Sequence, residues 1–164
     1  MGEAEFGLLD GVIETRPGML DGGEVVEVSF DPKRLSFEDL LAFAEEHECA
    51  SKVIARTDAQ LELAKSVVGA RASRSDKPID IDKDIKYYLS KSPLAALPMT
   101  ELQAARVNAS LAEGTWRQWL SPRQLDLLSR LEAQRQAEPK WAAPSAIGKP
   151  LIEVWYALES SLDG

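Results

Sequence analysis

Residues 24–41 (EVVEVSFDPKRLSFEDLL) constrain the fold most, because two structural periods follow one another within this stretch. Val26, Val28 and Phe30 alternate with Glu27 and Ser29, which predicts a strand with one apolar and one polar face. The Asp-Pro pair that comes next predicts a turn. Ser36, with Asp39 three residues later, is close to a capping box and predicts the start of a helix. The stretch therefore indicates an α+β unit.

The residues before this stretch predict a helix and another strand. Residues 3–9 predict a short helix that ends near Gly11, whose freedom at positive φ suits a C-terminal cap. Residues 12–15 predict a strand, and we expect Pro17 and Gly18 to break it. We expect this strand and the next one along the chain to be neighbours in a sheet.

Helix signals continue along the chain, and from Thr100 onward they dominate. Thr57 with Gln60 is another capping signature, and Ser121 is an N-cap with Pro122 at the first helical position. The elements expected after residue 36 are, in order, a helix at 37–46, a strand at 52–55, a helix after Thr57, a polar break at 71–77, a short strand at 78–82, a helical turn at 84–89, strong helices at 100–111 and 121–137, a linker at 136–150 and a terminal helix or strand at 152–162.

Charge and cysteine content narrow the classes of partner and compartment. The 164-residue chain carries a net charge of -8, with its acid concentrated in the first fifty residues. Counterion release needs clustered lysine and arginine, so we expect no nucleic-acid partner and no membrane partner. The single cysteine, Cys49, excludes an internal disulfide and a cysteine-rich zinc site. Without an apolar run of membrane-span length or a secretory signal, the expected localisation is cytoplasmic.

Residues 1–90 carry spaced motifs that resemble those of a known enzyme family. Residues 24–41 look like its His-Ala-Glu-Val-Val-x-Val-x-Tyr-Asp-Pro and Ser-Tyr-x-x-Leu-Leu motifs, and residues 43–48 are similar to its Phe-Trp-x-x-His-Asp. Residues 82–89 are similar, more weakly, to its acidic segment ending in Tyr-Leu. Met19 stands where the family has tyrosine. The other positions match the family without any insertion or deletion between them: Glu3, Phe6, Leu9, Gly11, Val12, Thr15 and Gly18. On these residues the chain resembles the type A peptide methionine sulfoxide reductases (MsrA).

The resemblance implies a fold and a division of the chain. The expected fold is α+β, a ferredoxin-like mixed sheet with helices packed on it, plus a C-terminal helical extension. The MsrA-like domain would cover residues 1–92 and the helical extension residues 93–138. A linker and a terminal element that packs back on the domain would occupy residues 139–164.

The resemblance also implies an oxidoreductase that reduces methionine sulfoxide, free or in peptides, with a thiol reductant such as thioredoxin and no cofactor. The family's catalytic cysteine would sit just before Met1, and its Asp-x-Gly-x-Gln-Tyr-Arg-Ser segment is absent after His47. We therefore expect an MsrA-like redox protein that is incomplete or inactive in the sequence given. The alternative is a non-catalytic protein-binding module that keeps the fold and docks through its C-terminal helices.

Three residues are candidates for the catalytic site. Glu24 matches the family's proton-donating carboxyl, a role that needs burial to raise the pKa; the alternative is an exposed acid at a strand start. Cys49 follows a helix C-terminus, which does not stabilise a thiolate, so it is either inert or a resolving thiol or substitute nucleophile. Tyr88 faces the family's active-site basin, or else one of Tyr87 and Tyr88 packs and the other is solvated. We expect a structural role for His47 and no metal site.

Overall fold

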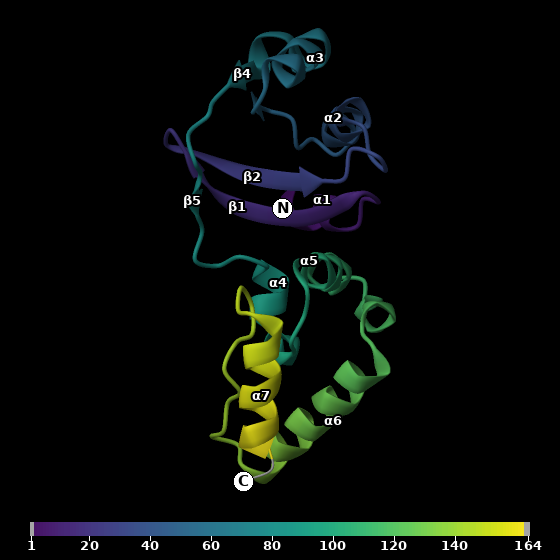
Figure 1. Ribbon diagram of the computed structural model, residues 1–164, viewed down its shortest axis with the longest axis vertical. Coiled ribbons are helices and arrows are strands. Elements are labelled where there is room, and N and C mark those ends of the chain that lie inside the picture. Colours follow the sequence, from purple (N-terminus) through teal and green to yellow (C-terminus); the bar gives the residue numbers. More distant parts are fainter. Residues whose placement is uncertain (1, 163–164) are drawn as a thin grey trace.

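The computed structural model describes residues 2–162 and shows a mixed α+β protein with two lobes (Figure 1). We call residues 2–82 the α+β lobe and residues 87–162 the helical lobe. The α+β lobe holds α1 (Gly2–Gly7), β1 (Val12–Leu20), β2 (Gly23–Phe30), α2 (Phe37–Glu46), β3 (Val53–Ala55), α3 (Asp58–Val68), the 3₁₀ turn η1 (Gly69–Arg71), β4 (Ala72–Arg74) and β5 (Asp80–Ile81). The helical lobe holds α4 (Tyr87–Ser90), η2 (Pro93–Ala96), α5 (Glu101–Ser110), η3 (Trp116–Trp119), α6 (Pro122–Ala137) and α7 (Leu151–Leu162).

The strands form two small sheets. One is an antiparallel sheet in the order β2-β1-β5, so the expectation that the first two strands share a sheet is confirmed. The other pairs β3 with β4 in parallel, and α3 makes the crossover between these two strands. The sheets therefore combine antiparallel and parallel pairing within one lobe.

The expected break at Pro17 and Gly18 is wrong, because β1 continues through both residues to Leu20. Pro17 keeps its register opposite Val26, and its carbonyl accepts the backbone N–H of Asp82 at 3.0 Å. A Cβ on Gly18 would collide with the Asp80 carbonyl oxygen. Glycine at this position therefore permits the close approach of β5, which sequence reasoning interpreted as a turn signal.

The helix caps agree with the sequence. Ser36 accepts the backbone N–H of Asp39 at 3.0 Å, and α2 covers the expected residues. Thr57 accepts the backbone N–H of Gln60 at 3.1 Å and opens α3. Ser121 caps α6 with Pro122 at its first position, as predicted. Short polar signals of this kind act over a few residues, so they determine helix starts locally.

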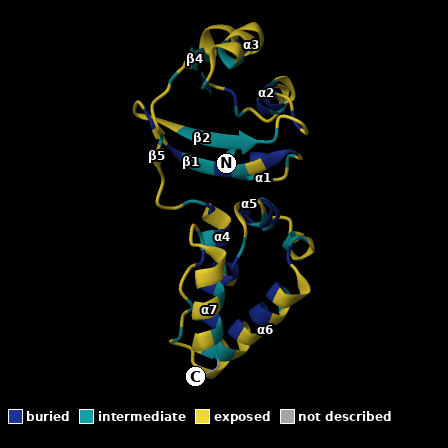
Figure 2. Ribbon diagram, viewed as in Figure 1, coloured by how far each residue is buried: buried dark blue, intermediate teal, exposed yellow. Residues whose placement is uncertain are grey.

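Each lobe has its own apolar core, and Figure 2 shows buried residues on the inner sides of the elements in both. In the α+β lobe, Phe6 of α1 and Leu40 of α2 are buried together, with Val26 and Val28 of β2 packed against them. The helical lobe has the larger core, which includes Leu131 of α6 and Leu158 of α7. Its four partly buried tryptophans, Trp116, Trp119, Trp141 and Trp155, pack against that core, where their large rings bury much apolar area.

Helix α5 joins the two lobes by packing against α1. Gly7 lies so close to α5 that a Cβ on it would be 2.7 Å from the Ala105 carbonyl oxygen. The guanidinium of Arg106 donates to the carbonyl of Gly7 (2.9 Å), the last residue of α1, and to the carbonyl of Leu9 (3.1 Å), two residues beyond it. None of the helices in residues 2–162 is long and apolar enough to span a membrane.

Candidate functional site

The start of α1 lies between β2 and the segment that follows α2. A Cβ built on Gly2 would be 3.4 Å from Val26 Cγ2 and 3.8 Å from Cys49 Sγ. We call this place, defined by Gly2, Val26 and Cys49, the α1 edge. At this edge the chain's single thiol lies beside Gly2, the first residue that the structure describes. The family resemblance begins in the same segment.

Cys49 is held at the α1 edge by backbone geometry. Its N–H donates to the Ala44 carbonyl at 2.7 Å, and its Sγ donates to the His47 carbonyl at 3.3 Å. Burial raises the pKa of the Cys49 thiol above its ordinary value of 9.0, and the negative charge of Glu5 raises it further. The thiol is therefore mainly protonated at neutral pH, which disfavours it as the first nucleophile on a sulfoxide.

His47 connects the end of α2 to α1. Its Nδ1 lies 3.1 Å from Glu5 Oε2, and its ring stacks on Phe43 with ring centroids 4.0 Å apart. His47 is also the C-cap of α2, where its backbone N–H bonds to the Phe43 carbonyl. These contacts orient the segment that carries Cys49.

Glu24 lies at the hairpin end of β2, opposite Met19 and next to the turn at Asp21 and Gly22. It shares a face of β2 with Val26, because side chains two residues apart in a strand point to the same side. The Glu24 residue is exposed. The two best-formed cavities are both lined by other residues, from the helical lobe. Glu24 therefore lacks the burial that a proton donor to an oxide would need.

Tyr88 belongs to α4 in the helical lobe. It is exposed, and so is Tyr87, whose ring meets it edge to face with centroids 5.6 Å apart. The ammonium of Lys91 lies 5.5 Å from the Tyr87 ring centroid. The expectation that one tyrosine packs while the other is solvated is therefore wrong. Among the described residues, no hydrogen bond or ring contact joins Tyr88 to Glu24 or Cys49.

A buried ion pair, which sequence reasoning missed, connects α1 to the start of α4. The ammonium of Lys86 lies 2.9 Å from Glu3 Oε1 and also donates to the Thr15 carbonyl. The Lys86 backbone N–H donates to both carboxylate oxygens of Glu3. Lys86 is 1% exposed and adopts a left-handed backbone conformation, with φ 54°. Lysine is rarely buried, so the only sequence signal was the position of Glu3 in the family resemblance.

Two further findings bear on the site. Within residues 2–162, no group of three or more histidine, cysteine, aspartate or glutamate side chains is placed to hold a metal ion. No protein-family model matches the chain, and comparisons with curated proteins and with solved structures give no significant match.

Proposed function

We propose that this chain is the scaffold of a cytoplasmic MsrA-like methionine sulfoxide reductase, in which Cys49 is the resolving thiol. The observation that carries the proposal is the position of Cys49 Sγ beside Gly2. By the family resemblance, the attacking cysteine would directly precede α1, so a thiol at the α1 edge would be its neighbour. Residues 1–164 hold no second cysteine, so we expect these residues by themselves to be inactive.

The proposed reaction divides the work between two thiols. The upstream thiolate attacks the sulfoxide sulfur, and the oxygen is transferred to give a thioether and a cysteine sulfenic acid. The Cys49 thiol then attacks the sulfenic sulfur, releases water and forms a disulfide. A thiol reductant such as thioredoxin reduces that disulfide to two thiols. The raised pKa of Cys49 suits this order, because a protonated thiol does not compete for the sulfoxide.

In this proposal Glu24 supplies the proton that the leaving oxygen requires. The support is its place on the same face of β2 as Val26, which touches the α1 edge. Glu24 is exposed in the structure of residues 2–162. To act as a proton donor it must be covered by upstream residues or by the substrate. Tyr88 has no assigned step in this reaction, since it lies on the exposed side of α4.

The proposed fold is the ferredoxin-like mixed sheet of that family. Three features support it: the β1–β2 hairpin, the β3–α3–β4 parallel crossover, and α1 and α2 with their apolar residues in one core. A strand leading into an upstream cysteine would add to these two sheets.

The test is to translate the codons upstream of Met1 and to assay the extended protein and residues 1–164 side by side. We expect a cysteine in frame just before α1 and turnover of peptide methionine sulfoxide by the extended protein with dithiothreitol. Cys49→Ser should keep this activity with dithiothreitol and lose it with thioredoxin, while Glu24→Gln should lower turnover with both reductants. An extended protein without a cysteine, or one that leaves the sulfoxide unreduced, would refute the reductase proposal.

The second candidate function is a non-catalytic protein-binding module. Ile152 and Tyr156, one turn apart on α7, are 61% and 67% exposed, an unusual exposure for large apolar side chains on one helix. If no upstream cysteine exists, this surface is the first to examine. Changing both residues to serine should then abolish partner binding without changing the melting temperature.

A further inference from the structure

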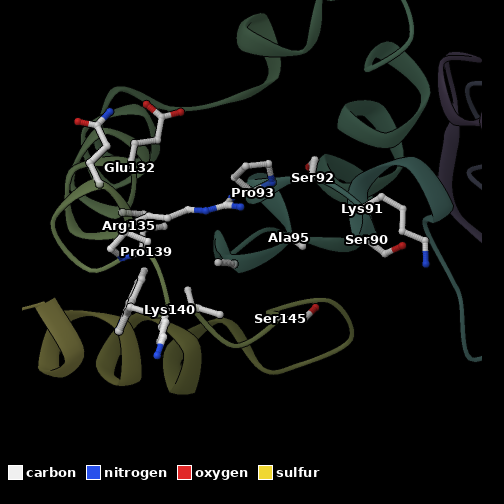
Figure 3. A pocket seen from close by; sticks show the side chains of 16 residues that line it. Ser90, Lys91, Ser92, Pro93, Ala95, Glu132, Arg135, Pro139, Lys140 and Ser145 are labelled. Carbon is white, nitrogen blue, oxygen red and sulfur yellow. The ribbon is translucent and has the colours of Figure 1, made fainter.

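A cavity lies in the helical lobe, far along the chain from the α1 edge (Figure 3). It has a volume of about 720 Å³ and opens between the Ser90–Ala96 region, the last turns of α6 and the segment around Trp141. Cavities of about 300–1,000 Å³ are typical of small-molecule sites. The space is therefore large enough for a metabolite-sized ligand.

The charged side chains around this cavity are mostly cationic, whereas the protein as a whole is acidic. Lys91, Arg135 and Lys140 line it, whereas Glu132 is its one acidic residue, in a chain of net charge -8. Figure 3 shows the Arg135 side chain extending from α6 toward Pro93, while the Glu132 carboxylate points away from that guanidinium. A positive site in an otherwise acidic protein attracts anions to this place.

Two of these cations, Arg135 and Lys140, are available to a ligand. Every arginine in residues 2–82 is ion-paired with a carboxylate. Within the described part of the chain, neither Arg135 nor Lys140 has a carboxylate partner, although Glu132 lies one turn before Arg135 on the same helix. A guanidinium without a partner is well suited to grip a carboxylate or phosphate with two parallel hydrogen bonds.

The remaining lining is apolar. Ala95, Ala96 and Leu131 are buried and form part of the wall, and the partly buried Trp141 lies on the segment opposite α6. The backbone N–H of Ala146 donates to the Ala95 carbonyl at 2.6 Å, which fixes that segment across the cavity. The arrangement joins an apolar wall to a cationic rim, the combination that retains an amphipathic small molecule.

We propose that this cavity binds a small organic anion, a molecule with an apolar body and one carboxylate, sulfonate or phosphate group. The anionic group bonds to Arg135, Lys140 adds positive charge at the rim, and the apolar body lies against Trp141 and Leu131. This site is separate from the α1 edge, so it stands whether or not the chain proves to be a reductase.

The probe is 8-anilinonaphthalene-1-sulfonate, compared with its uncharged analogue N-phenyl-1-naphthylamine, against the folded 164-residue chain. We expect saturable binding of one sulfonate probe per chain. Removing the charge in Arg135→Gln should weaken binding of the sulfonate probe by about tenfold, and Lys140→Gln should weaken it less, while both leave binding of the neutral analogue unchanged. Lys149→Gln is the matched control, because Lys149 is an exposed lysine on the same connecting segment but outside the cavity lining.

A second measurement locates the bound probe. Of the four tryptophan indole N–H signals in an NMR spectrum, the Trp141 signal, assigned with Trp141→Phe, should shift most on titration. Equal affinity of the two probes, unchanged affinity in Arg135→Gln and Lys140→Gln, or an unshifted Trp141 signal would each overturn the proposal. Far-UV circular dichroism melts of all variants check that they remain folded.

Discussion

The two lobes are held together differently. In the α+β lobe every arginine is ion-paired, and the apolar core is small. In the helical lobe the core is larger, and the cations around its cavity have no carboxylate partner among residues 2–162. The α+β lobe uses all of its arginines to connect its own elements, whereas in the helical lobe Arg123 pairs with Glu159 but Arg135 stays open to a ligand.

The contact between the lobes combines ion pairing with close packing. Lys86 lies between them: its ammonium reaches Glu3 in the α+β lobe, and Leu89, three residues later, is buried in the helical core. Gly7 and Arg106 make the other part of the contact, through close backbone packing and carbonyl hydrogen bonds. Changes at this contact test whether the lobes are truly distinct units.

The largest effect is expected for Lys86→Met, which leaves the Glu3 carboxylate buried without its cation. Breaking a buried ion pair from one side costs about 3–5 kcal/mol of unfolding free energy. Urea unfolding should show this loss both by tryptophan fluorescence, which reports the helical lobe, and by exposure of Cys49 to a thiol reagent, which reports the α+β lobe. The double variant Glu3→Gln with Lys86→Met should recover part of it. Loss of stability in one lobe alone would show that Lys86 belongs to that lobe only.

A smaller effect is expected for Gly7→Ala. The new Cβ would lie 2.7 Å from the Ala105 carbonyl oxygen and 2.9 Å from the Ala109 Cβ, so α1 and α5 must separate. Overpacking of this kind costs about 1–3 kcal/mol, measured by urea unfolding. The matched control is Gly23→Ala, whose Cβ would meet only the Leu20 carbonyl, at an ordinary 3.6 Å. If the two variants are equally stable, the lobes are not in close contact at Gly7.

The smallest effect tests the surface pairing of the α+β lobe. The hydrogen bond and charge of Lys77 lower the pKa of Asp21 below its ordinary 3.8, and the charge of Lys52 lowers it slightly more. A lowered carboxyl pKa adds stability above the ordinary pKa, and this contribution is lost as pH falls through the folded value. In a carboxyl NMR titration, Lys77→Ala should raise the Asp21 pKa toward 3.8, and Lys52→Ala should raise it less. An unchanged pKa in Lys77→Ala would mean that the pair is not formed in solution.

Local elements could be predicted from the sequence, and contacts between distant elements could not. Ser36, Thr57 and Ser121 each satisfy a backbone N–H three residues away, so their meaning is contained in the sequence around them. Gly18 was misread because its small size serves β5, a strand that begins about sixty residues later. Lys86 was missed for the same reason, since its burial depends on Glu3, 83 residues earlier in the chain.

For the candidate site, too, single residues could be predicted from the sequence, and contacts between distant residues could not. The resemblance drew attention to Cys49 and Glu24, and the structure puts the Cys49 thiol beside Gly2, a proximity that no local pattern encodes. The cationic cavity was not anticipated, because Lys91 follows α4 and Arg135 lies in α6, and both look like ordinary surface charges in the sequence. Only the folded chain brings them together.

The long-range bonds that hold α1 also have a consequence for biosynthesis. The Glu3–Lys86 pair spans 83 residues and the Arg106–Gly7 bond spans 99. At ribosomal speeds of roughly 5–20 residues per second, the nascent amino-terminal helix waits on the order of ten seconds before its last anchoring side chain is made. During that interval the emerging polypeptide is a natural client for chaperones that shield unpartnered apolar surface.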